Sequence, residues 1–185
     1  LSEKLGIVET PYLGMEHQTI IAYGNKYKKT KMGYDGLLFH EMGHEWWGNF
    51  LSVSDWSDFW IPEGFTTYAE ALYIEENFGV TAYHAFMQNT CRKNIRNDKP
   101  LVGNKYATTD EIKGTEYYYK GAYVLHMLRY LVGYDVLLET LNDYLYTPKS
   151  NNNQTTTKEF IKLLEGNSKM ELSWFFNQFV YQYIY

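Results

Sequence analysis

This sequence has very little of several features that define common protein classes. Its single cysteine, Cys91, rules out an internal disulfide bond and lies in a stretch with helical spacing, where we expect a small packing residue. No apolar run approaches the length of a membrane-spanning helix. Acidic residues outnumber basic ones, 22 to 17, and the net charge of −5 argues against a nucleic-acid partner. Neither a starting methionine nor a signal peptide is present, so we expect the chain to come from a longer protein, whose compartment it does not reveal.

The composition that remains is that of a globular protein. A chain of 185 residues, 45% hydrophobic and 21% charged, is long enough to bury the core of one domain. Aromatic residues reach 18% and include 19 tyrosines, which line clefts in many proteins but also reflect the compositional bias of some proteomes. Because the sequence contains no repeat or domain linker, we treat residues 1–185 as a single domain.

The most informative stretch begins with the sequence HEMGH at residues 40–44. Asp35 can cap a helix that starts near Gly36, and on that helix His40 and His44 project from one face, one turn apart. This spacing suits two corners of a zinc tetrahedron. The pattern H-E-x-x-H on a helix is typical of zinc metallopeptidases, in which the glutamate, here Glu41, serves as the general base.

A third metal ligand follows after eighteen residues. Glu63 comes directly after Pro62, which is favoured in the first turn of a helix, and apolar residues recur at helical spacing beyond it. Two histidines and one glutamate leave a fourth zinc position for water, as a catalytic site requires. In the alternative interpretation, Glu63 only favours a helix N-terminus through the helix dipole. A structural zinc site would need a fourth protein ligand, and no cysteine lies near the motif.

These residues and their neighbours resemble a known family, the M1 zinc aminopeptidases of the gluzincin group. The matching motifs are H-E-M-G-H, then W-W-G-N, then W-I-P-E-G-F, and the similarity runs from about Pro11 to the C-terminal WFFNQFVYQ. The resemblance implies a thermolysin-like catalytic domain that holds one zinc ion per chain. It also implies flanking domains in the parent protein that are missing from this chain.

The resemblance assigns further site residues. Gly14, Met15 and Glu16 match the family's G-A-M-E-N motif, although Leu13 and His17 depart from it. In the family this glutamate binds the free α-ammonium group of the substrate, and Met15 is expected to border the pocket for the first side chain. A plain surface carboxylate and a packing methionine are the alternatives.

A second motif of the family, Tyr-x-Lys-Gly-Ala, matches Tyr118 to Ala122. The catalytic tyrosine lies three residues before the glycine, which selects Tyr118. The pattern alone could not choose among the three adjacent tyrosines. For the outer hydrogen-bond partners of the histidine ligands we nominate Glu70, two helical turns after Glu63, and Asp58. A solvated carboxylate is the alternative for both.

The expected fold class is α+β and mostly helical, with a small N-terminal β part and a helical lobe. Residues 1–25 should be extended, and residues 51–60 should form a short extended crossing. Residues 147–157 are expected to be a loop. We expect helices from Gly36 to Gly48 or Asn49, from Glu63 to Gly79, from Thr81 to Ile95, after Gly121 to Gly133, over residues 134–147, and twice more before the C-terminus.

The predicted function is zinc-dependent removal of the N-terminal residue from peptides that have a free N-terminus. One alternative is a gluzincin endopeptidase, which would share the zinc ligands but would not need an amine-binding glutamate. Another is a peptide-binding module with little activity, which the presence of Glu41 and Tyr118 disfavours.

Overall fold

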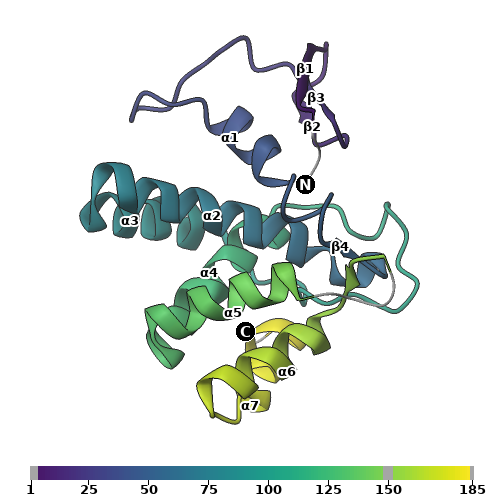
Figure 1. The fold of residues 1–185 in the computed structure, drawn as a ribbon, viewed down its shortest axis with the longest axis vertical. Helices are drawn as coiled ribbons and strands as arrows, with labels where there is room; N and C mark the ends of the chain where they lie inside the picture. Colours follow the sequence, from purple (N-terminus) through teal and green to yellow (C-terminus); the bar gives the residue numbers. More distant parts are fainter. Residues whose placement is uncertain (1–3, 148–151, 184–185) are drawn as a thin grey trace.

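The computed structural model describes residues 4–147 and 152–183 of this chain. A small β-sheet lies at one end of the molecule, and a layered group of helices makes up the rest (Figure 1). The sheet contains β1 (Gly6–Glu9), β2 (Gly14–Met15) and β3 (Ile20–Tyr23). A separate pair of short strands, β4 (Ser52–Val53) and β5 (Gln154–Thr155), ties the middle of the chain to its C-terminal third.

Helices account for 55% of the residues that the structure describes, so the predicted α+β class with a helical majority is confirmed. The α-helices are α1 (Gly36–Gly43), α2 (Trp60–Phe78), α3 (Val80–Phe86), α4 (Glu116–Val132), α5 (Tyr134–Tyr146), α6 (Thr157–Ser168) and α7 (Ser173–Phe176). Shorter turns of 3₁₀-helix or π-helix are η1 (Trp56–Asp58), η2 (Met87–Cys91), η3 (Arg92–Asn94) and η4 (Asn177–Tyr181). Among the described residues, no helix is both long enough and apolar enough to cross a membrane.

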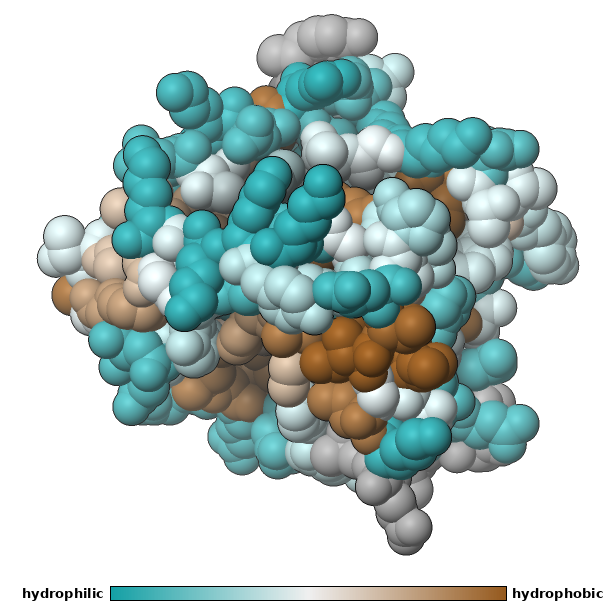
Figure 2. Space-filling view, turned by 90° about the horizontal axis from the view of Figure 1, so that it is seen from above, coloured by the Kyte–Doolittle hydropathy of each residue, from teal (hydrophilic) through white to brown (hydrophobic). Residues whose placement is uncertain are grey.

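The strand order β1-β3-β2 places β2 at one edge of the N-terminal sheet. The outer strand β1 runs parallel to β3, whereas β2 runs antiparallel to it, with Gly14 opposite Tyr23 and Met15 opposite Ala22. Both β2 and β3 contact α1. Three apolar residues of this sheet are each about half exposed: Ile7, Val8 and Ile20. Figure 2 shows brown apolar patches between polar side chains on this view of the molecule.

The helix α2 is the centre of the fold. It lies between α1 on one side and α4 on the other (Figure 1). Most of its residues from Trp60 to Ala71 are buried, and the buried ones include the polar residues Glu63, Thr66 and Thr67. Aromatic side chains from α2, α5, α6 and α7 pack beneath it, among them Phe65, Tyr144 and Phe160.

Several predicted helix boundaries are wrong, including the start of α4, which begins at Glu116 rather than after Gly121. The helix α1 ends at Gly43 rather than near Gly48, because Gly48 has a φ of +132° and the chain turns back so that Trp47 pairs with Leu51. The helix α2 begins at Trp60, so that Pro62 and Glu63 lie within its first turn. The helix expected from Thr81 to Ile95 is the short α3 followed by η2 and η3, and Gly79 rather than Thr81 precedes it.

Candidate active site

His40 lies in the short helix α1, and His44 lies at the C-cap of that helix, one turn later. Asp35 caps this helix, as predicted, and its carboxylate accepts a hydrogen bond from the main-chain N–H of Leu38 at 3.1 Å. Asn25 and Tyr23 also donate to Asp35, which ties the start of α1 to the end of β3. The Nε2 atoms of His40 and His44 lie only 3.1 Å apart.

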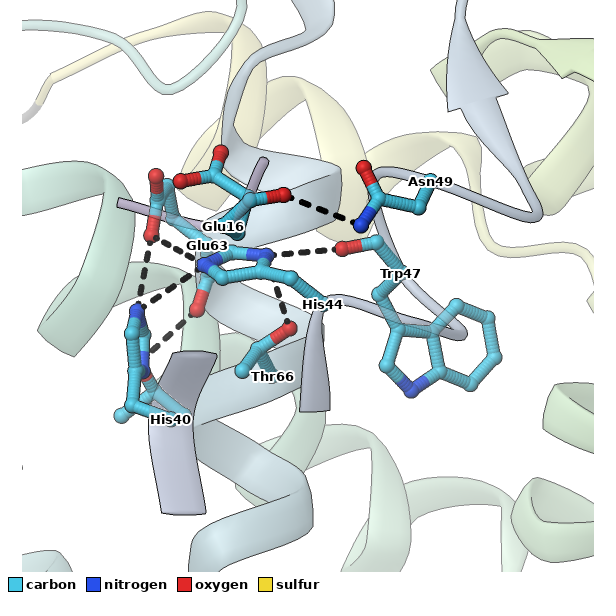
Figure 3. A network of polar contacts seen from close by, with 8 residues as sticks. Glu16, His40, His44, Trp47, Asn49, Glu63 and Thr66 are labelled. Carbon is cyan, nitrogen blue, oxygen red and sulfur yellow. Dashed lines mark hydrogen bonds and ion pairs between the residues drawn. The ribbon is translucent and has the colours of Figure 1, made fainter. Parts of the chain in front are cut away.

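Glu63 completes a group of three donors. Its Oε2 atom lies 3.1 Å from Nε2 of His40 and 3.5 Å from Nε2 of His44 (Figure 3). The three side chains come from two helices, and both His44 and Glu63 are buried. The structure therefore brings together the three residues that the sequence predicted as metal ligands.

The dimensions of this group fit a zinc ion. Zinc–nitrogen and zinc–oxygen bonds of about 2.0–2.1 Å in a tetrahedron require donor atoms about 3.3 Å apart. The three separations of 3.1, 3.1 and 3.5 Å bracket that value. Two imidazole nitrogens and one carboxylate oxygen are also the donor types that zinc prefers. The residues present thus suit such an ion.

Burial and mutual contact shift the pKa values of His40, His44 and Glu63. Burial lowers the pKa of His44, but the hydrogen bond and negative charge of Glu63 outweigh burial and raise it to about 9. Burial lowers the pKa of His40, and Glu63 offsets only part of this effect. For Glu63 itself, burial raises the pKa, but hydrogen bonds from the two histidines outweigh it and lower the value to about 2. Glu63 is therefore a carboxylate at neutral pH and can serve as an anionic ligand.

Glu41 lies on the buried side of α1, directly beside these donors. Its side chain is 6% exposed, and its Oε2 atom has no hydrogen-bond partner among the described residues. Burial raises the pKa of Glu41 to about 7. Gly14 of β2 packs against the Glu41 carboxylate so closely that any Cβ at that position would collide with it. Burying a carboxylate oxygen without a hydrogen-bond partner costs free energy, which indicates that the site receives a further polar group.

Glu16, the residue that follows the edge strand β2, lies close to the same group. One carboxylate oxygen of Glu16 lies within 4.8 Å of donor atoms of both Glu41 and His44. Met15 is 43% exposed and lines the cleft. Both residues that the sequence assigned to substrate binding therefore reach the cleft that contains the three metal donors.

Tyr118 approaches from the first turns of α4. Its ring stacks on the imidazole of His40, with centroids 5.6 Å apart and planes inclined by 25°. Burial, followed by the charge of nearby Glu63, raises the pKa of Tyr118 far above its ordinary value, so the phenol keeps its proton and can donate it in a hydrogen bond. The neighbouring Tyr117 is buried against Phe59 instead, at a centroid distance of 5.5 Å.

These side chains share a cleft of about 550 Å³. Trp56, Phe59 and Ile112 supply much of its apolar wall. A second recess of about 280 Å³ adjoins it on the other side of Glu16 and Trp56, and it is lined in part by His17 and Asn49. The cleft is thus bounded by β2, by α1, by α2, which carries Glu63, by the start of α4 and by the loop that precedes α4.

Comparison with known proteins identifies the family. The family model described as the peptidase family M1 domain matches residues 4–179, which is nearly the whole chain. The chain belongs to peptidase family M1. Membership in this family of zinc metallopeptidases implies a zinc ion.

The individual M1 relatives have low sequence identity to this chain and are much longer than it. Endoplasmic reticulum aminopeptidase 2 of Bos taurus is 26% identical over 149 residues, and aminopeptidase N of Oryctolagus cuniculus is 32% identical over 125 residues. These matches cover 76% and 60% of this chain, but only 16% and 13% of the relatives. The chain therefore spans a small part of the length of the curated proteins it matches.

Solved M1 structures share the fold. The M1 zinc metallopeptidase from Deinococcus radiodurans superimposes with a TM-score of 0.79 at 24% identity, over 98% of this chain and 40% of that one. Aminopeptidase A of Legionella pneumophila, in complex with aspartic acid, gives a TM-score of 0.77 at 19% identity, over 96% of this chain and 22% of that one. At these identities the likeness establishes the architecture and not the chemistry.

In this M1 chain the outer partner of one histidine is a main-chain group. Nδ1 of His44 lies 2.8 Å from the carbonyl oxygen of Trp47 and 3.3 Å from the hydroxyl of Thr66 (Figure 3). The carbonyl can only accept, so Nδ1 donates a proton to it, and Nε2 is the nitrogen that faces the other metal donors. Neither partner was predicted from the sequence. Thr66 lies one turn after Glu63, a spacing that could have suggested it, whereas a main-chain carbonyl has no signal in the sequence.

The two carboxylates nominated for this outer role have other described partners. Glu70 accepts a hydrogen bond from the hydroxyl of Tyr34 at 2.6 Å. Asp58 accepts hydrogen bonds from the main-chain N–H and the hydroxyl of Thr157, at 3.2 and 2.5 Å, and so fixes the start of α6. The described bonds of Asp58 therefore connect two helices of the M1 domain and give no support to its nomination.

Proposed function

We propose that this chain is the catalytic domain of a zinc aminopeptidase that removes the N-terminal residue from peptides with a free α-amino group. The observation that carries the proposal is the juxtaposition of three elements. The three donor atoms of His40, His44 and Glu63 have the separations that a zinc ion requires, and they lie beside the buried, unpartnered carboxylate oxygen of Glu41. A carboxylate oxygen of Glu16 lies within 4.8 Å of donor atoms of Glu41 and His44. His40, His44 and Glu63 would hold the zinc ion.

When bound, zinc acts as a Lewis acid and lowers the pKa of a coordinated water. The protein groups then divide the remaining work. Glu41 accepts the proton of the attacking water and delivers it to the amine that leaves. Its buried position, which brings its pKa to about 7, suits a group that must both take and give a proton near neutral pH. Tyr118 donates its phenolic hydrogen bond to the substrate carbonyl oxygen as negative charge develops there.

Glu16 determines where the peptide is cut. An ammonium group that pairs with its carboxylate brings the first peptide bond, and no later one, to the metal donors. Three carboxylates, those of Glu16, Glu41 and Glu63, surround this region, so the cleft favours a cationic group over a neutral acetylated one. Met15 borders the space for the first side chain.

An endopeptidase of the same metal class is the second candidate, because it would use the same three ligands and Glu41. The position of Glu16 disfavours it, since an anionic group close to the metal donors has no role when uncharged main chain occupies that place. The relatives are much longer than this chain, which matters for its domain organisation. We propose a single catalytic domain over residues 1–185 that works together with flanking domains.

The proposal can be tested with paired substrates. Leucine p-nitroanilide and its N-acetyl derivative differ only at the amine, and the zinc-loaded protein should hydrolyse the first and hardly attack the second. Glu41→Gln should lower kcat by roughly 10²- to 10⁴-fold and leave the zinc content unchanged, because an amide cannot accept the proton. Glu76→Gln, an exposed glutamate of α2, is the matched control. Equal rates on the two substrates would favour the endopeptidase, and a near-normal Glu41→Gln protein would reject Glu41 as the base.

A further inference from the structure

The main chain of Glu16 is held by a side chain of the turn that follows α1. The strand β2 ends at Met15, so Glu16 lies beyond the last paired residue of the sheet. Its carbonyl oxygen accepts a hydrogen bond of 3.0 Å from Nδ2 of Asn49 (Figure 3). Asn49 is separated from Glu16 by 33 positions in the sequence and lies in the turn that follows α1.

Asn49 is itself fixed to the helix that carries the histidines. Its main-chain N–H donates to the carbonyl oxygen of His44 at 2.9 Å, and its side-chain amide also reaches Oε1 of Glu45 at 3.3 Å. The turn between them closes because Gly48 adopts its positive φ and its N–H donates to Leu51. Two hydrogen bonds therefore connect the main chain of Glu16 to the main chain of His44, and Asn49 is the link.

This connection affects the distance between the Glu16 carboxylate and the metal donors. In an aminopeptidase that distance determines which peptide bond reaches the metal. The carboxylate of Glu16 must lie one residue away from the metal donors, and an error of about 1 Å in such a distance can cost about 10²-fold in rate. The strand β2 is only two residues long and ends at Met15, so its own pairing does not fix the residue that follows. The bond from Asn49 is formed where that pairing ends.

We propose that Asn49 is a positioning residue that sets the place of Glu16 relative to His44 and thereby tightens binding of the substrate α-ammonium group. The inference rests on the proposed function, because it requires Glu16 to be the amine anchor. Asn49 does not contact substrate or metal in this account, and its effect passes entirely through Glu16.

The test compares variants of the zinc-loaded protein. Asn49→Ala removes the donor, and Asn49→Asp keeps the shape but places a carboxylate oxygen against the carbonyl of Glu16. Both retain the main-chain bond to His44. The readouts are the Kd of L-leucine and of N-acetyl-L-leucine by calorimetry, KM and kcat on leucine p-nitroanilide, and zinc content. Asn77→Ala is the matched control, because Nδ2 of this exposed residue also donates to a main-chain carbonyl, that of Tyr73, at 2.9 Å.

Loss of one such hydrogen bond should weaken L-leucine binding about five- to tenfold in Asn49→Ala and at least as much in Asn49→Asp. Binding of N-acetyl-L-leucine should hardly change, the effect on catalysis should appear mainly in KM, and zinc content should match the wild type. In a Glu16→Ala background, Asn49→Ala should have no further effect on L-leucine binding, as expected for two residues that act as one unit.

Different failures reject different claims. If Asn49→Ala behaves like Asn77→Ala, if Asn49→Asp binds normally, or if the effect persists in the Glu16→Ala background, Asn49 does not position Glu16. A loss of zinc in Asn49→Ala would place its action on the histidine turn and also overturn the inference. If Glu16→Ala alone leaves the preference for L-leucine over its acetyl derivative intact, the amine anchor of the proposed function is wrong.

Discussion

Gly64 of α2 and Gly121 of α4 touch backbone to backbone. A Cβ atom built on Gly64 would lie 2.8 Å from the Cα atom of Gly121, and the reverse substitution would meet Gly64 at the same distance. Glu63 directly precedes one glycine, and Tyr118 lies three residues before the other. The close approach of the two helices therefore determines how near the tyrosine comes to the metal donors.

Gly64→Ala should destabilise the fold. A methyl group has no room between the two backbones, so the helices must separate, and such overpacking costs about 1–3 kcal/mol of unfolding free energy. Gly166→Ala is the matched control, since this glycine also lies in a helix, α6, and a Cβ there meets no atom within 4 Å. That control should be neutral or more stable by up to about 1 kcal/mol. Urea unfolding measures both, and equal stabilities would show that the crossing is not tightly packed.

Tyr118→Phe should remove most of the catalytic rate and leave the metal in place. The loss of one donor to a developing oxyanion typically lowers kcat by about 10²- to 10³-fold. Tyr117→Phe and Tyr119→Phe are the controls within the same turn of α4, and Tyr117 is buried against Phe59, away from His40. Steady-state kinetics at matched zinc content decide the matter. If the large loss occurs in either neighbour instead, the assignment of Tyr118 is off by one position.

Stability should fall in acid through His126. Its Nδ1 lies 2.6 Å from the hydroxyl of Tyr83, which donates to the neutral ring. Burial first, and then electrostatic interactions with His84 and Arg129, lower the pKa of His126 from 6.5 to about 4. The folded state therefore binds fewer protons than the unfolded chain between these values, so unfolding free energy rises with pH across this window. As the pH falls from about 6.5 to about 4, roughly 3 kcal/mol would be lost at most.

The variant His126→Gln should unfold with a shallower pH dependence over that window. His17→Gln, at an exposed position, should follow the wild type. Release of zinc in acid affects all three proteins alike, so the difference between them isolates His126. Parallel pH profiles for His126→Gln and the wild type would contradict a buried, neutral imidazole.

The parts of the site that could be predicted from sequence are those whose geometry is local. His40 and His44 share a helix face because helical periodicity requires it, and the cap at Asp35 is a property of four consecutive residues. Glu63 was placed by its spacing and by Pro62, and its helix begins close to where these indicate. Glu16 and Tyr118 needed the family resemblance, because nothing in their own neighbourhoods distinguishes them from ordinary surface or packing residues.

The parts that sequence did not predict depend on main-chain atoms and on contacts between distant segments. The acceptor for His44 is the carbonyl of Trp47, and a carbonyl group is the same in every residue. The end of α1 is decided by the backbone turn at Gly48. The hydrogen bonds that Asp58 accepts come from Thr157, which lies 99 residues later in the chain. Tertiary packing determines each of these features.

The central claim is that one zinc ion binds between His40, His44 and Glu63, and locating the metal tests it most directly. Diffraction data collected on both sides of the zinc absorption edge, from crystals of the zinc-loaded protein, reveal zinc by its anomalous signal. We predict a single strong peak within bonding distance, about 2.0–2.2 Å, of both histidine Nε2 atoms and of the Glu63 carboxylate. A peak elsewhere in the molecule, or a peak at this place that Glu63 does not contact, would contradict the account.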